Sequence, residues 1–256
     1  MIKAAFFDVD GTLLSHKTKQ VPLSAIRALE TLKAKGIRCI VSTGRQIHEM
    51  DRLPMGGVTF DGYITMNGQL TMDENRQELY GMPLEGEVLE YALKLFNEHV
   101  VPVIFVERDR LYVNSETQRV IDVQTAISSK VPPVGRYEGA DVFQACVYIT
   151  EAEEALLEPV AGKCVVTRWH PGGVDIIAKG GGKRTAVERY CREHGWTREE
   201  IIAFGDSEND LEMIRYAGIG VALGNAEEEV KAAADYVTAD IDDDGLAKAL
   251  QYFGLI

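Results

Sequence analysis

The chain has few cysteines, and none of them forms the C-x-x-C pair found in many zinc sites and redox motifs. The four cysteines of its 256 residues are Cys39, Cys146, Cys164 and Cys191. Cys39 lies in an apolar segment that we expect to be a core strand. We therefore expect buried free thiols in a reducing cytosol rather than a framework of disulfides.

The sequence also lacks an excess of positive charge and a long apolar run. Its 40 acidic and 27 basic residues give a formal net charge of −13, which disfavours nucleic acids and anionic membrane surfaces as partners. No stretch approaches the roughly 20 apolar residues of a membrane span, and no basic, signal-like segment opens the chain. We expect a cytoplasmic protein, a monomer or small homo-oligomer, without a nucleic-acid or membrane partner. A small anionic substrate is not excluded, because local cations set the field inside a site.

Two carboxylates lie two residues apart, directly behind an apolar segment near the amino terminus. Residues 2–7 are typical of a buried parallel strand, and Asp8 and Asp10 follow them. Gly11 then lets the backbone turn away. Because open α/β sheets bind ligands at the carboxyl ends of their strands, this pair is a candidate site. Such a pair alone more often lies on a solvated turn. Whether it forms a site therefore depends on which other residues the rest of the chain brings to this edge.

The outer parts of the chain alternate strand and helix patterns, as in a doubly wound parallel sheet. Apolar segments at residues 37–41 and 201–204 repeat this pattern. Between about Leu70 and Val174, strand-like segments alternate with Glu-rich helical stretches, and none of those strands ends in an acidic pair. We therefore predict a Rossmann-like α/β core formed by residues 1–80 and 175–256, with an inserted α+β domain at residues 81–174.

Polar side chains follow several predicted core strands at their carboxyl ends. They are Asp8 and Asp10, the hydroxyl pair Ser42 and Thr43, Asn67, and Asp206 with Asn209 and Asp210. Lys183 opens a predicted helix after three glycines. Strand ends of a parallel sheet meet at one edge, so these side chains should lie together. Oxygen ligands suit Mg²⁺, and a lysine and a hydroxyl suit phosphoryl oxygens, so the set favours Mg²⁺-assisted phosphoryl transfer.

Some of these residues also have a plainer interpretation. Ser42 and Thr43 could simply cap the following helix. Lys183 could be one of many solvated lysines, and Lys179 is a rival for the same role.

In order and spacing, these residues resemble the four motifs of the haloacid dehalogenase superfamily of phosphatases. The motifs read Asp8-Val9-Asp10-Gly11-Thr12-Leu13-Leu14, Val41-Ser42-Thr43-Gly44-Arg45, Lys183, and Gly205-Asp206-Ser207-Glu208-Asn209-Asp210. The match covers the whole chain. The long insertion between the second and third motifs resembles that of the Cof-type subfamily, which carries a type IIB α/β cap. Arg184 stands where relatives usually have glycine after the lysine, which suggests a different start of that helix.

The resemblance implies a role for each acid. Asp8 would be the nucleophile that forms an aspartyl-phosphate. Asp10 would protonate the leaving oxygen and then activate the hydrolytic water. Mg²⁺ would be held by Asp8, the backbone carbonyl of Asp10 and Asp206, with Asp210 supporting it through its waters.

The resemblance also implies which residues bind the phosphoryl group. Ser42, with Thr43 as the alternative, and Lys183 would bind it. Asn209 would bind phosphate or orient the lysine.

Residues that select the leaving group are expected near or within the inserted cap domain. Arg45, Arg168, Trp169 and His170 are candidates by position or by chemistry. Trp169 is equally suited to packing, and His170 could only shape a hinge before the following Pro-Gly-Gly.

These features together favour a Mg²⁺-dependent phosphatase that acts on small phosphomonoesters, above all sugar phosphates. A phosphotransferase or phosphomutase on the same fold would pass the phosphoryl group to another hydroxyl. A non-catalytic module would only bind a phosphorylated metabolite, but such a relative would be expected to lose Asp8 or Asp10, and this chain keeps both.

Overall fold

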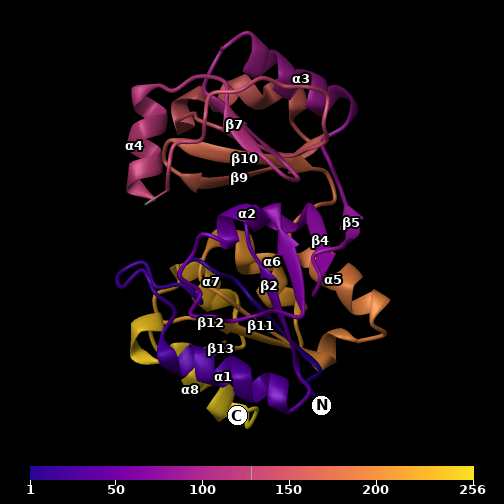
Figure 1. Cartoon of the computed structure of the whole chain (residues 1–256), viewed down its shortest axis with the longest axis vertical. Helices are drawn as coiled ribbons and strands as arrows, with labels where there is room; N and C mark the ends of the chain where they lie inside the picture. The colour runs from indigo at the N-terminus through magenta and orange to yellow at the C-terminus, as the bar shows by residue number, and fades with distance from the viewer. Residues whose placement is uncertain (128) are drawn as a thin grey trace. The chain divides into compact units, whose positions relative to one another are not determined.

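The computed structural model describes residues 1–127 and 129–256. They divide into two compact units, which Figure 1 shows in sequence colours. Residues 1–80 and 182–256 form the core unit, and residues 81–181 form the inserted unit. The chain therefore leaves the core unit after its first third and returns to complete it.

The core unit is built on a mixed sheet whose central strands run parallel. The strands are β1 (Ala4–Phe7), β2 (Arg38–Ser42), β3 (Gly62–Thr65), β4 (Leu70–Asp73), β5 (Glu78–Gly81), β11 (Ile201–Gly205), β12 (Ile219–Ala222) and β13 (Tyr236–Val237). They lie in the order β13-β12-β11-β1-β2-β3-β4-β5. The pairings from β13 to β3 are parallel, and β4 runs antiparallel to β3. The predicted doubly wound parallel sheet is confirmed.

Helices cover both faces of this sheet. They are α1 (Leu23–Ala34), α2 (Ile47–Met50), α5 (Lys183–Glu193), α6 (Leu211–Tyr216), α7 (Glu228–Ala233) and α8 (Gly245–Tyr252), with 3₁₀ turns η1 (Met66–Gly68), η3 (Arg198–Glu200), η4 (Glu208–Asp210) and η5 (Ile241–Asp243). Phe6 and Ile40 pack with Val187 of α5 in one buried cluster. Cys39 points to the opposite face, where its Sγ lies 4.0 Å from the Leu29 carbonyl oxygen of α1; α8 packs beside α1 (Figure 1). Burial on both faces explains why these strands read as continuous apolar runs.

The inserted unit is an antiparallel sheet with α3 and η2 packed on one face. Its elements are α3 (Gly86–Asn97), β6 (Val103–Glu107), β7 (Leu111–Val113), α4 (Gln118–Ala126), β8 (Val142–Val147), η2 (Glu151–Val160), β9 (Cys164–His170) and β10 (Gly173–Ala178). The strand order is β7-β6-β8-β10-β9, with antiparallel pairings. Alternate residues such as Val103 and Phe105 face Phe96 of α3 and Leu157 of η2. This unit therefore has its own apolar core.

The predicted second boundary of the insertion, between Val174 and Asp175, falls inside β10. Val174, Asp175 and Ile176 all pair with β8, and β10 continues to Ala178 against β9. The units divide after Gly181 instead. Because the backbone of β10 pairs with β8 and β9 of the inserted sheet along its length, residues 175–181 belong to the inserted unit.

Two further features concern the whole described chain. Within residues 1–127 and 129–256, no helix combines the length and apolarity that crossing a membrane requires. All four cysteines are free, and Cys39 and Cys191 are buried.

Candidate functional site

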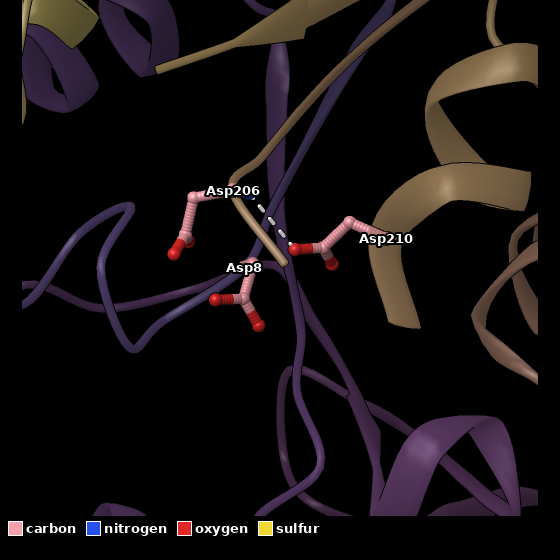
Figure 2. A group of neighbouring side chains, drawn as sticks. All are labelled: Asp8, Asp206 and Asp210. Carbon is pink, nitrogen blue, oxygen red and sulfur yellow. Dashed lines mark hydrogen bonds between the residues drawn. The ribbon is translucent and has the colours of Figure 1, made fainter. Parts of the chain in front are cut away.

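Three carboxylates meet at the carboxyl edge of the core sheet. Asp8 follows β1 and Asp206 follows β11, and because these strands are parallel neighbours the two residues emerge side by side. Asp210 ends the turn η4, and Figure 2 shows its carboxylate close to the other two. All three residues are buried, and one oxygen of each lies within 4.8 Å of the others.

The backbone after β11 fixes the position of Asp210. Its Oδ2 accepts N–H bonds from Asp206 at 3.0 Å and from Ser207 at 3.1 Å; the first is the dashed line in Figure 2. A Cβ atom on Gly205 would lie 2.5 Å from the Asp210 Cβ. Only glycine therefore fits at the end of β11.

Lys183 is the cation of this cluster. Its Nζ donates to Asp8 Oδ1 at 2.6 Å and to Asp210 Oδ1 at 2.7 Å. Only 1% of its side chain is exposed. Burial by itself lowers the pKa of Lys183, but the charges of Asp210 and Asp8 raise it by more than burial lowers it. The pKa therefore lies above its usual value, and the amine stays charged. Its rival Lys179 lies in the inserted unit, where Nζ donates to the Gly162 carbonyl at 2.8 Å.

The cluster carries more negative charge than Lys183 can balance. Burial raises the pKa of Asp8 well above its usual value, with Lys183 opposing the shift. Burial, then Asp210, raises the pKa of Asp206 to about 7. One ammonium against three carboxylates leaves a deficit of two positive charges if all three are ionised. A buried set of oxygen ligands with that deficit fits a divalent cation.

The turn after Asp10 packs directly on Asp206. Thr12 Oγ1 donates to Asp206 Oδ1 at 2.7 Å. Gly11 has φ +89°, and a Cβ atom there would lie 2.2 Å from Asp206 Oδ2. Glycine is required for both reasons, because another residue would strain the backbone and collide with a carboxylate.

Asp10 has a different environment from Asp8. Arg45 donates to its two oxygens, with Nε 2.6 Å from Oδ2 and Nη2 2.8 Å from Oδ1. The Asp10 side chain is 30% exposed, against 8% for Asp8. Arg45, expected from the sequence to contact substrate, is thus bound to Asp10. Burial lowers the pKa of Arg45, but the bond to Asp10 outweighs it and raises the pKa overall.

The two hydroxyl side chains at the end of β2, Ser42 and Thr43, differ in their hydrogen bonding. Thr43 Oγ1 accepts the N–H of Arg45 at 3.1 Å. Ser42 Oγ is buried and has no hydrogen-bond partner within the part of the chain that the structure describes. A buried hydroxyl without a partner is costly, which is consistent with Ser42 serving a bound group.

Asn209 is bonded to another strand-end residue. Its Nδ2 donates to Asn67 Oδ1 at 2.9 Å. Asn67 has a left-handed backbone with φ 54°, and its N–H donates to the Thr43 carbonyl at 3.0 Å. The loops after β2, β3 and β11 are therefore joined at this edge of the sheet.

The candidates in the inserted unit have partners within that unit. Arg168 pairs with Glu154 at 2.6 Å. The Trp169 ring packs edge-on against Tyr148, and His170 Nδ1 accepts the N–H of Gly172 at 3.0 Å. Trp169 Nε1 is buried and has no hydrogen-bond partner among the described residues. A role of these three residues toward substrate stays a prediction.

Three further side chains hold the site together. Asn67, already expected from the sequence among the strand-end side chains, accepts a bond from Asn209. Thr12, which bonds Asp206, and Asn225, whose Nδ2 donates to the Gly11 carbonyl at 2.8 Å, were not expected to have a role. Asn225 follows the end of β12, so the strand-end pattern that singled out the other residues could have found it.

Comparison with known proteins identifies the family. The sequence model of the haloacid dehalogenase-like hydrolases matches residues 5–250. YkrA of Bacillus subtilis is 31% identical over 99% of this chain and 98% of its own length. The pyridoxal phosphate phosphatase YbhA of Escherichia coli is 28% identical over 94% of each chain. The subclass IIB sugar phosphatase BT4131 has a similar solved structure, with a TM-score of 0.85, 38% identity, and 99% of this chain and 100% of that chain covered. The chain therefore belongs to the haloacid dehalogenase-like hydrolase family and is a phosphatase of that superfamily.

Proposed function

We propose that this protein is a Mg²⁺-dependent phosphatase of small phosphomonoesters, foremost sugar phosphates, that works through an aspartyl-phosphate. The observation that carries the proposal is the buried group of Asp8, Asp206 and Asp210 around Lys183. It combines a nucleophile, cation ligands and a fixed positive charge at one sheet edge. We further propose that the protein acts in the cytoplasm as a monomer or small homo-oligomer.

In the first step, an oxygen of Asp8 attacks phosphorus, and the bond between phosphorus and the leaving oxygen breaks. Lys183 holds Asp8 at 2.6 Å and orients it, and its ammonium attracts the phosphoryl oxygens. The unpartnered hydroxyl of Ser42 supplies a further donor, with Thr43 as the alternative. Asn209 completes this phosphate-binding set or orients Lys183.

Asp10 moves the protons. It gives one to the leaving oxygen and takes one from the water that attacks the aspartyl-phosphate, which releases phosphate and restores Asp8. The guanidinium group of Arg45 donates to both Asp10 oxygens, through Nε and Nη2. We infer that Arg45 keeps this carboxyl group in place between the two steps.

The donor set suits a divalent cation with a preference for oxygen. Asp8, the Asp10 backbone carbonyl and Asp206 would hold it, while Asp210, which already accepts bonds from Lys183 and the Asp206 backbone, would support it through bound waters. When bound, the cation would offset the repulsion between the phosphoryl oxygens and the Asp8 carboxylate.

Similarity to known phosphatases supports the substrate class that we propose. The sugar phosphatase BT4131 is 38% identical and the pyridoxal phosphate phosphatase YbhA 28%. Identity favours a sugar phosphate over pyridoxal phosphate. Both kinds of substrate carry the phosphate on an alkyl oxygen, whose departure requires a proton from Asp10.

The test is phosphate release from sugar phosphates, nucleotides, pyridoxal phosphate and 4-nitrophenyl phosphate, with Mg²⁺ and with EDTA. We expect metal-dependent release that is greatest for a sugar phosphate and absent from Asp8→Asn. Release in EDTA would overturn the metal requirement. Appreciable release by Asp8→Asn would overturn the nucleophile, and transfer to an added sugar hydroxyl rather than to water would favour a phosphotransferase.

A further inference from the structure

The side chain of Asn225 joins three loops at the carboxyl edge of the core sheet. Its Nδ2 donates to the Gly11 carbonyl at 2.8 Å, in the loop after β1. Its Oδ1 accepts the N–H of Ile241 at 3.0 Å, where the turn η5 begins in the connection after β13. Asn225 itself lies in the loop after β12, so its amide uses both ends to bond backbone from two other loops.

The rest of the Asn225 loop is bound to the backbone around Asp206. The N–H of Leu223 donates to the Gly205 carbonyl at 3.2 Å, and the N–H of Glu227 donates to the Asp206 carbonyl at 2.9 Å. The loop is therefore anchored to the segment that carries Asp206. A side chain that extends from this loop has a fixed starting point.

The Gly11 turn is thus held on two sides. One side packs on the Asp206 carboxylate, where Gly11 leaves no space for a Cβ atom and Thr12 donates a hydrogen bond. On the other side Asn225 holds the Gly11 carbonyl. This turn directly follows Asp10, whose carboxyl group is held at its far end by Arg45.

We propose that Asn225 is a positioning residue for the reaction, and that it acts by fixing the backbone turn that directly follows Asp10. The proposal rests on the proposed function, in which Asp10 protonates the leaving oxygen. Asn225 holds the Gly11 carbonyl, in the peptide that joins Gly11 to Thr12, and so keeps the turn after Asp10 against the Asp206 segment. The Asp10 carboxyl group then stays within reach of the leaving oxygen. Misplacing a proton donor by about 1 Å can lower a rate by about 10²-fold.

This role differs from a general support of the fold. Asn225 is exposed; its amide bonds backbone atoms of the buried residues Gly11 and Ile241 but adds no apolar side chain to the core. Losing its amide donor should therefore change proton transfer to the leaving group more than it changes unfolding. Substrates that differ in their need for that proton separate the two effects.

The experiment compares two variants at one position. Asn225→Asp keeps an acceptor for the Ile241 N–H and loses the donor to Gly11, and Asn225→Ala loses both. Asp235→Ala is the matched control: the Asp235 carboxylate accepts the Gly220 N–H at 2.7 Å, a side-chain bond to the same strand β12 but at its other end.

The readout is kcat/KM, which covers the steps through the first phosphoryl transfer. It is measured with Mg²⁺ for the best alkyl phosphate of the panel and for 4-nitrophenyl phosphate, whose phenolate leaves without a proton. We expect both Asn225 variants to lose about 10-fold or more with the alkyl phosphate and less than about 3-fold with 4-nitrophenyl phosphate. Asp235→Ala should change neither value, and melting temperatures should show that all variants are folded.

Other results would overturn the proposal. Equal losses with both substrates would mean that Asn225 supports the site as a whole. A loss in Asn225→Ala but not in Asn225→Asp would assign the effect to the Ile241 bond, and unchanged kinetics in both would exclude any role. If the unsubstituted protein releases no phosphate from either substrate, the proposed function itself fails, a result distinct from each of these.

Discussion

Arg45 binds Asp10 through a two-pronged hydrogen bond, at 2.6 and 2.8 Å, while Lys183 binds Asp8 at 2.6 Å. The two acids of the first loop are only two residues apart in the sequence, yet each has its own cation. Asp8 is deeply buried beside an ammonium that it shares with Asp210, and Asp10 lies nearer the surface with a guanidinium of its own. Different surroundings are what two carboxyl groups need in order to take different chemical roles.

The two-pronged hydrogen bond from Arg45 to Asp10 should be needed for turnover. Arg45→Lys keeps the charge but cannot bond both Asp10 oxygens in one plane, so we expect kcat to fall about 10-fold or more with little loss of stability. Steady-state kinetics with an alkyl phosphate measure this effect. Arg76→Lys is the control, because Arg76 makes the same two-pronged bond to Asp51 on the surface of the core unit. Equal kinetics in the Arg45 and Arg76 variants would contradict the prediction.

Removing the buried ammonium should destabilise the core unit. Lys183→Met leaves Asp8 and Asp210 buried without their cation, and breaking such a group typically costs about 3–5 kcal/mol of unfolding free energy. Urea denaturation at pH 7 without metal measures the loss. Lys3→Met removes the exposed bridge to Glu200, which solvent screens, and should cost far less unfolding free energy than Lys183→Met. A comparable loss in both variants would mean that Lys183 does not neutralise the cluster.

Gly11→Ala should impair both folding and activity, and Gly36→Ala should affect folding alone. Both glycines have a positive φ, +89° and +78°, but only a Cβ atom at Gly11 would collide with Asp206, whereas one at Gly36 meets nothing within 4 Å. Backbone strain alone costs about 1–2 kcal/mol, so the difference between the variants isolates the collision. Denaturation midpoints and phosphate release are measured on both. Full activity in Gly11→Ala would show that Asp206 can move without consequence.

Mg²⁺ should raise the melting temperature of the protein. A cation that binds only the folded state stabilises it by about 2.7 kcal/mol at 100 times its dissociation constant. Thermal unfolding with MgCl₂ and with EDTA measures the shift, and Asp206→Asn should remove most of it. Asp240→Asn, at the start of the turn η5, should leave the shift unchanged. If the Asp206 variant kept the full shift in melting temperature, the cluster of Asp8, Asp206 and Asp210 would not be the cation site.

The stability of the inserted unit should depend on pH through Glu153. Hydrogen bonds from the Thr150 backbone and from Arg119 lower the pKa of Glu153 from 4.5 to about 2. The folded state therefore favours the charged form, so the contribution is present above pH 4.5 and declines as pH falls toward 2. Glu153→Gln should lower the melting temperature at pH 7 and progressively less below pH 4.5, with the exposed Glu158→Gln as the control. A pH-independent difference would exclude this linkage.

Much of the fold and the chemical character of the site could be predicted from local sequence. The run of apolar residues before Asp8 predicts a buried strand, and an acid at the end of such a strand lies at a ligand-binding edge whatever surrounds it. The same reasoning predicted Asp206, Asp210 and Lys183 as neighbours. The end of the inserted unit was placed seven residues early, because a pattern of side chains does not show which sheet a strand such as β10 joins.

The amino-acid sequence by itself determined the alternation of strands and helices, the acids at the strand ends and the family, because these depend on residue type and order. Only the tertiary structure decided which charges are paired. Whether Arg45 meets Asp10, and whether Asn225 reaches Gly11, depends on strand order and on loops that are distant in sequence. The choice of Lys183 over Lys179 is of the same kind, because the two lysines lie four positions apart and in different units. Such contacts are set when the sheet assembles, and no local pattern encodes them.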